Sequence, residues 1–158
     1  MGFARKRCCV RQNTDFKIYL AGKMTGLTLE EMSKWRDQFA REMRKNGVEF
    51  LVKPFEIINP ADYFNTVDDV DTDPKQYIRW ELRSVLSSDL IVARISKGQD
   101  SLGTMAEITA AFQCGIPILL YNPDKIPHED IHPFVWYFSD ACFEDAEALR
   151  MHIFANYL

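Results

Sequence analysis

The sequence predicts a three-layer α/β domain, flavodoxin-like or Rossmann-like, with a five-stranded, mostly parallel sheet. Five short apolar runs alternate with segments of helical periodicity, which is typical of this class. Two of the runs, residues 89–95 and 115–121, flank a helical segment that Gly115 can end. Such a βαβ unit requires parallel strands, because its crossover is a helix. A length of 158 residues with 47% hydrophobic content suits one domain with a core.

Composition narrows the classes of function. A net charge of −4 argues against nucleic acid or an anionic membrane as the main partner. No apolar run reaches membrane length, and the four cysteines show neither metal nor disulfide spacing. We therefore expect a cytoplasmic protein, with residues 1–14 as a disordered basic extension and residues 15–158 as a single α/β domain.

The first strand is expected at residues 17–21, followed by a loop at residues 22–26 that begins and ends with glycine. Glycine lets the backbone turn sharply and come close to a ligand. The pair Gly22 and Lys23 is reminiscent of a phosphate-binding P-loop, but the upstream glycine of that motif is missing and Thr25 is one position late. We therefore reject a P-loop.

A long amphipathic helix should follow this loop. Thr28 and Glu31 form a capping box that opens it, and residues 46–47, Asn-Gly, should end it. A second strand is expected at residues 48–52. Residues 53–72 then form a long acidic loop, and loops above about 12–15 residues are usually functional lids or disordered.

Asp73 and Pro74 are a favourable N-cap and first-turn pair for a helix that should run to Ser87. Its apolar side should face the sheet through Ile78, Leu82, Val85 and Leu86. Asp89 begins the third strand, at the amino end of the sheet and away from the ligand edge. We therefore expect a structural role for Asp89.

The C-terminal part should contain a short fifth strand at residues 141–143 and a last helix at residues 144–157. The aromatic run at residues 134–138 exceeds what an edge layer needs, so part of it is expected at a subunit interface. His128 and His132 have a spacing that can bind metal, but prolines beside them disfavour a helix there. We expect no metal site.

The segment after the third strand carries the strongest candidates for function. A βαβ unit places residues 98–107 at the carboxyl end of a central strand, where ligands bind in open α/β sheets. Ser101, Gly103, Thr104 and Glu107 are therefore candidate site residues. A structural alternative is that Thr104 and Glu107 form a capping box at the start of the helix.

Together these motifs resemble the nucleoside 2-deoxyribosyltransferase superfamily. The resemblance rests on the opening strand and loop at residues 18–26, Ser-Asp-Leu-Ile-Val at residues 88–92, and residues 101–108 followed by Gly-Ile-Pro at residues 115–117. It implies cleavage or transfer at the N-glycosidic bond of a (deoxy)nucleoside or its 5′-monophosphate, without a cofactor. It also implies a homo-oligomer, dimer or higher, because relatives complete each pocket with a neighbouring subunit.

The resemblance also implies roles for single residues. Glu107 matches the nucleophile that attacks the anomeric carbon, and Glu81 stands where the family usually has a second, aspartate carboxylate. Ser101 resembles the 5′-monophosphate N-glycosidases, whereas the nucleoside transferases carry an acid there. Those glycosidases carry an arginine where this chain has Thr25. Tyr19 is expected to orient Glu107 or to line the sugar pocket.

The chemistry needs two carboxyl groups in different states. Placed in the first helical turn, Glu107 should be kept ionised by the helix dipole and amide donors, while Glu81 should keep a raised pKa and act as the acid. Two carboxyl groups about 5 Å apart would favour a covalent intermediate. A wider separation would favour direct attack by water. The candidate substrate-binding residues are Gly22, Lys23, Met24, Thr25, Ser101, Gly103 and Thr104.

Two other functions are compatible with this pattern. One is a nucleotide-binding sensor domain of the same fold that turns nothing over. The other is a cytokinin-type phosphoribohydrolase, which also uses a G-T-x-x-E motif, but the doubled glycine expected before that motif is replaced by Ser101 and Leu102.

Overall fold

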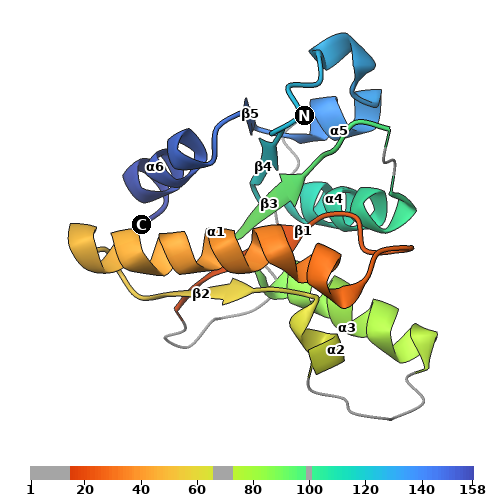
Figure 1. Cartoon of the computed structure of the whole chain (residues 1–158), viewed down its shortest axis with the longest axis horizontal. Coiled ribbons are helices and arrows are strands. Elements are labelled where there is room, and N and C mark those ends of the chain that lie inside the picture. The colour runs from red at the N-terminus through yellow and green to blue at the C-terminus, as the bar shows by residue number, and fades with distance from the viewer. Residues whose placement is uncertain (1–14, 66–72, 99–100) are drawn as a thin grey trace, which may run out of the picture.

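The computed structural model describes residues 15–65, 73–98 and 101–158. The expected extension at residues 1–14 lies outside the described residues. The described strands form one parallel sheet in the order β2-β1-β3-β4-β5 (Figure 1). Their bounds are β1 Phe16–Ala21, β2 Phe55–Ile58, β3 Leu90–Arg94, β4 Ile118–Tyr121 and β5 Ala141–Phe143. This arrangement confirms the flavodoxin-like prediction, and every pairing in the described sheet is parallel.

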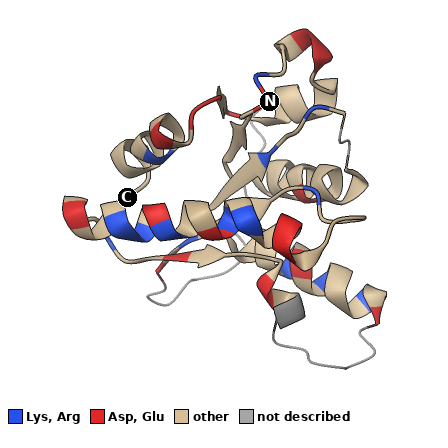
Figure 2. Cartoon of the chain, viewed as in Figure 1, with Lys and Arg blue, Asp and Glu red and all other residues tan. Residues whose placement is uncertain are grey.

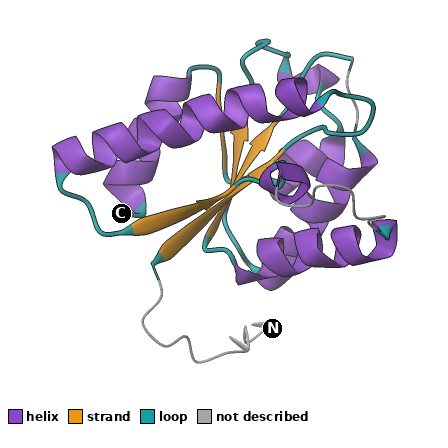
Figure 3. Ribbon diagram, turned by 60° about the horizontal axis from the view of Figure 1, so that its bottom comes forward, coloured by secondary structure: helices purple, strands orange, loops and turns teal. Residues whose placement is uncertain are grey.

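Helices cover both faces of the sheet (Figure 3). One face packs against α1 (Leu29–Phe50) and α6 (Ala146–Asn156), and the other against α3 (Pro74–Ser87), α4 (Leu102–Cys114) and α5 (Pro133–Phe138). Two short elements, α2 (Asp62–Asn65) and the 3-10 helix η1 (His128–Asp130), lie in connections. In the described part of the chain, no helix combines the length and the apolar character needed to cross a membrane.

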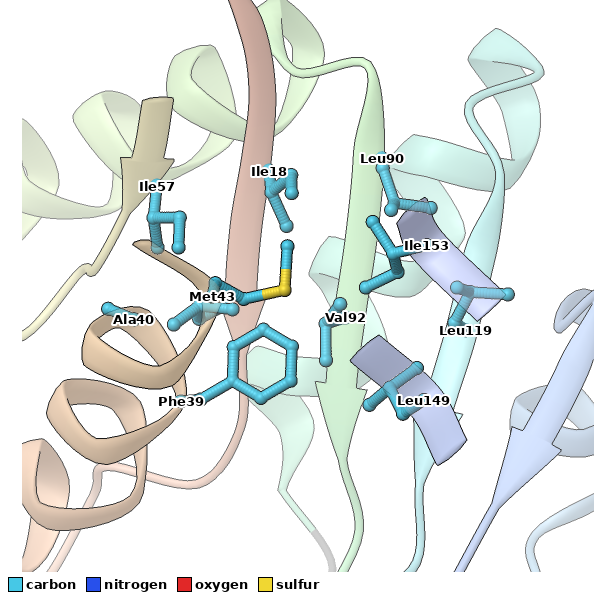
Figure 4. Close-up of a cluster of buried hydrophobic side chains, with 11 residues drawn as sticks. Ile18, Phe39, Ala40, Met43, Ile57, Leu90, Val92, Leu119, Leu149 and Ile153 are labelled. Atoms are coloured by element: carbon cyan, nitrogen blue, oxygen red, sulfur yellow. The ribbon is translucent and has the colours of Figure 1, made fainter. Parts of the chain in front are cut away.

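The strands are buried on both sides, so their side chains alternate between two cores. Ile18, Leu90, Val92 and Leu119 point toward α1 and α6 and contact residues such as Met43 (Figure 4). The intervening residues form the second core with α3 and α4; they are Tyr19, Ala21, Ile91, Ala93, Ile118 and Leu120. Because both faces are covered, the sheet has only its two edge strands and its strand ends available to solvent or ligand.

The predicted end of the first helix is wrong. The capping box of Thr28 and Glu31 is present, but α1 continues through Gly47 to Phe50 and ends at Leu51, which adopts a left-handed conformation with φ 53°. A Cβ at Gly47 would lie 2.8 Å from the ring of Phe55, so a glycine inside the helix allows this ring to pack against it. Gly47 therefore serves helix–strand packing and does not end the helix.

The second strand is displaced accordingly. Residues 48–52 are the last turn of α1 and its cap, and β2 begins only at Phe55. The predicted loop at residues 53–72 therefore contains β2 and α2, and its residues 66–72 lie outside the described residues. Periodicity failed here because a short apolar run fits both a helix end and a strand.

The helix before the central strand follows the prediction at its start. Asp73 accepts a hydrogen bond from the Lys75 amide, Pro74 begins α3, and the helix runs to Ser87. The predicted sheet-facing side is only partly correct. Val85 is buried, whereas Ile78 and Leu86 are 52% and 47% exposed. One apolar face of α3 therefore remains open in the single chain.

Elements at the C-terminal end agree with the expected order. β5 lies at residues 141–143 as predicted, and α6 is N-capped by Asp145. The aromatic run forms most of the short helix α5, with Phe134 and Tyr137 exposed. Asp89 accepts a hydrogen bond from the Lys17 amide at 2.9 Å, which confirms a structural role between the starts of β1 and β3.

Candidate active site

The candidate site lies where the chain changes direction within the sheet. From β1 the chain goes to β2 on one side, and β3 pairs with β1 on the other. In a sheet of this order, the crevice beyond the carboxyl ends of β1 and β3 is the topological switch point, where ligands bind. The loop after β1 and the start of α4 border this crevice, and most of the predicted site residues belong to these segments.

A hydrogen bond joins two of the predicted catalytic residues. Tyr19 lies in β1 and is fully buried, and its hydroxyl donates to Oε1 of Glu107 at 2.5 Å. Glu107 projects from α4 and is only 5% exposed. The two residues are 88 positions apart in the chain, so the parallel arrangement of β1, β3 and α4 brings them together. This geometry fits the expectation that Tyr19 orients Glu107.

The predicted capping box at Thr104 and Glu107 is wrong. α4 is N-capped by Ser101, whose hydroxyl accepts a hydrogen bond from the Thr104 amide at 3.3 Å. The helix starts at Leu102, so Glu107 lies in its second turn, beyond the unpaired amides of the helix start. Its carboxylate bonds to Tyr19 and does not fold back on its own backbone. The capping alternative for this residue is thereby removed.

The protonation state of Glu107 also differs from the expectation. Burial and, to a smaller extent, the nearby Glu81 raise the pKa of Glu107, which comes to about 8. The hydrogen bond from Tyr19 and the positive charge of Arg36 favour the ionised form but do not outweigh burial. The helix dipole therefore does not keep this carboxyl ionised, because Glu107 is too far along the helix and too well desolvated.

The second predicted carboxyl, Glu81, lies on α3 and is half-buried. The Tyr77 hydroxyl donates to its Oε1 at 2.5 Å. Burial raises the pKa of Glu81, as expected for the acid of the pair. The positive charge of Arg36 lowers the pKa of both carboxyls, and the negative charge of Glu81 raises the pKa of Glu107. The two predicted acids are therefore close enough to influence each other's ionisation.

Arg36 is a residue of this site that the sequence analysis missed. It is fully buried on α1, and its guanidinium donates to the carbonyl oxygens of Leu20, Gly22 and Met32. It thereby fixes the end of β1 to α1. The available signal was a single arginine among the buried residues of α1, one residue after Trp35.

The loop after β1 holds the remaining predicted residues in different environments. Gly22 is buried, and a Cβ there would lie 3.1 Å from the Trp35 ring, so a larger residue would press on this ring. Met24 contacts the Tyr77 hydroxyl through its sulfur at 3.9 Å. Thr25 is exposed, as is Gly103 at the start of α4. Gly22 and Met24 thus lie beside Arg36 and Tyr77, whose electrostatic effects extend to the acid pair.

A cavity of about 540 Å³ opens over the carboxyl ends of the strands. From the candidate set, Lys23, Ser101 and Thr104 line it, whereas Tyr19, Glu81 and Glu107 do not. Thr104 lies one helical turn before Glu107 on α4, so the cavity and the acid pair adjoin through this helix. The predicted site residues therefore form two neighbouring groups.

The two histidines with metal-like spacing have other contacts. His132 accepts a hydrogen bond from the Phe134 amide and so caps α5, and His128 lies against Trp136 and Glu129. Across residues 15–65, 73–98 and 101–158, no group of three or more His, Cys, Asp or Glu is arranged to hold a metal ion.

Comparisons with known proteins place the chain in a family. The family model described as "Nucleoside 2-deoxyribosyltransferase like" matches residues 15–125. No curated protein matches the chain.

Solved structures share its fold at low sequence identity. A 2-deoxyribosyltransferase from Bacillus psychrosaccharolyticus is 22% identical, with a TM-score of 0.63 over 90% of this chain and 92% of that one. The CMP N-glycosidase BcmB from Clostridium botulinum is 18% identical, with a TM-score of 0.55 over 90% and 99%. A 2-desoxiribosyltransferase from Leishmania mexicana is 15% identical, with a TM-score of 0.64 over 90% and 99%. Because the family model spans more than two thirds of the residues, including both site loops and Glu107, the chain belongs to the nucleoside 2-deoxyribosyltransferase-like family.

Proposed function

We propose that this protein is an enzyme that cleaves or transfers the N-glycosidic bond of a (deoxy)nucleoside or its 5′-monophosphate. The observation that carries this proposal is the buried hydrogen bond from Tyr19 to Glu107, with Glu81 close enough to raise the pKa of Glu107. Paired carboxyls are the groups that glycosidic chemistry uses. Their position at the switch point and the family membership of the chain support the same conclusion.

In the proposed reaction, the ionised Glu107 attacks the anomeric carbon of the sugar. The bond between this carbon and the base nitrogen breaks, and the electron pair leaves with the base, which receives the proton of Glu81. The sugar is then held as an ester of Glu107. Glu81, now ionised, takes a proton from water or from an incoming base, which attacks the same carbon and releases Glu107. Water as acceptor makes the enzyme a hydrolase, and a base makes it a transferase.

The environment of the pair suits these roles in different ways. The raised pKa of Glu81 keeps a proton available for the departing base. Tyr19 holds Glu107 in one orientation through its hydroxyl. Arg36 favours the carboxylate that must attack, since a positive charge nearby lowers the pKa of Glu107. The developing positive charge on the sugar favours the same ionised form in the transition state.

The named functions of two structural neighbours fit this scheme. One is a 2-deoxyribosyltransferase and the other a CMP N-glycosidase, so they represent transfer of a sugar and release of a base. Both reactions begin by breaking an N-glycosidic bond. We therefore propose this first step for the chain and leave the acceptor to the assay.

The test is a panel of ribo- and deoxynucleosides and their 5′-monophosphates, each with and without an acceptor base, with the free base measured by chromatography. We expect base release from at least one member. Glu107→Gln keeps the size of the side chain and an oxygen that can accept from Tyr19, and should lower the rate by roughly 10³-fold or more. Glu49→Gln, at an exposed position near the end of α1, is the matched control and should retain full activity.

A sensor domain without turnover is the competing function, and the 5% exposure of Glu107 favours it, because a nucleophile must reach its substrate. In that case the panel yields no free base although a nucleotide binds. Full activity of Glu107→Gln would also overturn the proposed mechanism, since base release would then need another nucleophile.

A further inference from the structure

Each acid of the proposed pair accepts a hydrogen bond from a tyrosine hydroxyl. Tyr77 is half-buried on α3, one helical turn before Glu81, and its hydroxyl donates to Oε1 of Glu81 at 2.5 Å. The hydrogen bond from Tyr19 to Glu107 has the same length. The two acids are thus held in the same way, although one tyrosine comes from a strand and the other from the helix of its own acid.

Glu81 differs from the other charged residues of α3. Figure 2 shows charged residues of both signs along this helix, and Lys75, Arg79 and Arg83 are exposed, whereas Glu81 is half-buried. A glutamate side chain has three rotatable bonds, so its carboxyl keeps one position only where neighbouring groups hold it. Among the residues that the structure describes, Tyr77 is the only hydrogen-bond donor to this carboxyl. The position of the carboxyl therefore depends on Tyr77.

The ring of Tyr77 is itself held by its neighbours. Its centroid lies 5.1 Å from that of Tyr63 in α2 and 6.3 Å from that of Trp80 in α3. The rings of Tyr63 and Trp80 are 5.0 Å apart, so the three rings form one cluster. The sulfur of Met24, in the loop after β1, lies 3.9 Å from the Tyr77 hydroxyl oxygen. A ring packed in this way directs its hydroxyl to one place, and the carboxyl that accepts from it is held there as well.

The surroundings of Tyr77 keep its hydroxyl protonated. Burial, followed by the hydrogen bond and the negative charge of Glu81, raises the pKa of Tyr77 above its ordinary value of 10. Tyr77 therefore remains a hydrogen-bond donor at neutral pH. Burial raises the pKa of Glu81, whereas the hydrogen bond from Tyr77 and the positive charge of Arg36 lower it. Glu107 on α4 and Tyr19 on β1 are the other titratable groups of this cluster, and the charge of Glu81 acts on both.

We propose that Tyr77 is a positioning residue for the proposed reaction and that it acts through Glu81. Its hydroxyl holds the carboxyl of Glu81 in one orientation, so that the departing base receives its proton from a fixed direction. The proposal rests on the proposed function, in which Glu81 is first the acid and then the base. Tyr77 itself transfers no proton. When Glu81 has given its proton to the base, the hydrogen bond from Tyr77 stabilises the carboxylate that remains and that later takes a proton from water or from an incoming base.

A double-mutant cycle tests whether Tyr77 acts through Glu81. Tyr77→Phe keeps the ring in its aromatic cluster and removes only the hydroxyl, and it should lower kcat for base release roughly tenfold or more with little change in KM. Glu81→Gln should lower kcat at least as much. In the Glu81→Gln background, Tyr77→Phe should cause no further loss, because the carboxyl that it positions is already absent. A further loss of the same size in that background would overturn the proposal, since Tyr77 would then act independently of Glu81.

A titration supplies a second measurement that does not depend on turnover. In protein made with isotope-labelled glutamate, the carboxyl signal of Glu81 is the one that Glu81→Gln lacks, and its pKa is measured by NMR. The pKa of Glu81 should rise in Tyr77→Phe, because the carboxylate loses a donor that favours it. Tyr137→Phe, which removes the hydroxyl of an exposed tyrosine, should change neither this pKa nor kcat. An unchanged or lower pKa of Glu81 in Tyr77→Phe would contradict the proposed contact.

Failure of this proposal can be told apart from failure of the proposed function. If the wild-type protein releases base and Tyr77→Phe does so at the same rate, the role of Tyr77 is overturned and the proposed reaction stands. If the wild-type protein releases no base from any member of the panel, the proposed reaction is overturned, and with it the role of Tyr77 in that reaction, whatever the titration of Glu81 shows.

Discussion

At the scale of single residues, the site depends on a carboxyl that its surroundings keep from ionising. Glu107 is buried against Tyr19, and desolvation outweighs the hydrogen bond and the charge of Arg36, so that its pKa rises to about 8. A carboxyl of this kind is neutral in much of the free protein at neutral pH. Both activity and stability should therefore depend on pH in a characteristic way.

We expect kcat/KM to rise with pH until Glu107 is ionised in the free enzyme. Tyr19→Phe removes a hydrogen bond that favours the carboxylate, so the pKa of Glu107 should increase and the rising limb should move to higher pH. Tyr137→Phe, which removes the hydroxyl of a tyrosine that is 76% exposed, is the control. A limb that stays in place or moves to lower pH in Tyr19→Phe would contradict this assignment.

The same carboxyl should make the folded state less stable as the pH rises. Below its ordinary pKa of 4.5 the group is protonated in both states, and between about 4.5 and 8 only the unfolded chain releases the proton. The free energy of unfolding should therefore fall by a few kcal/mol across this interval.

Urea denaturation at several pH values measures this fall. Glu107→Gln, whose side chain does not titrate, should make the free energy of unfolding depend less on pH. Glu49→Gln should show the same pH dependence of stability as the wild-type protein. An unchanged slope in Glu107→Gln would show that this carboxyl has an ordinary pKa.

At the scale of elements, α1 shows how packing moved a boundary. Gly47 would ordinarily end the helix, but the ring of Phe55 packs against it, and the helix continues for three residues. The left-handed turn then falls on Leu51, a residue poorly suited to it. In this turn, the Leu51 amide donates a hydrogen bond to the Gly47 carbonyl.

Leu51→Gly should stabilise the protein by about 0.5–1 kcal/mol. Glycine removes the cost of a left-handed conformation, which is about 1–2 kcal/mol for other residues, and this gain exceeds the loss of chain entropy. The Leu51 side chain is 90% exposed, so its removal costs little packing. The urea midpoint of Leu51→Gly should exceed that of Leu51→Ala, which retains the strain; equal midpoints would mean that no strain is relieved.

At the scale of the whole molecule, one buried charge links the sheet to its covering helix and to the site. Arg36 joins α1 to the end of β1 through the backbone carbonyls of Leu20 and Gly22, and it interacts electrostatically with Glu107 and Glu81. The same side chain thus supports the fold and favours the ionised form of both acids.

Arg36→Met should lower the free energy of unfolding by about 3–5 kcal/mol, because it leaves buried carbonyl groups unpaired. In protein that remains folded, loss of the positive charge should also shift the rising limb of kcat/KM to higher pH. Arg36→Lys keeps the charge but not the planar fork, so it should lose stability with a smaller shift of the limb. Equal shifts in both variants would indicate that Arg36 acts on the site through structure alone.

Much of the fold could be predicted because it depends on local patterns. The apolar runs of β1, β3 and β4, the cap at Asp73 and the left-handed Gly115 were all correctly predicted. The errors concern the end of α1, the position of β2 and the start of α4. At the end of α1 a partner distant in sequence is involved, whereas α4 starts earlier because Ser101 is its cap. Phe55 against Gly47 is the clearest case, since no local pattern records that contact.

The sequence by itself determined the order of the parallel elements and placed Glu107 in the segment after the third strand, because hydrophobic periodicity and turn chemistry are encoded within short segments. The family resemblance, and not periodicity, pointed to Glu81 as the second acid. Only the tertiary structure decided that Glu107 bonds to Tyr19 rather than capping its own helix. It also placed the charge of Arg36 within range of that carboxyl and the Tyr77 hydroxyl on Glu81. Burial and the electrostatics of a pKa depend on residues that are distant in the chain, and the packing of the sheet against its helices brings them together.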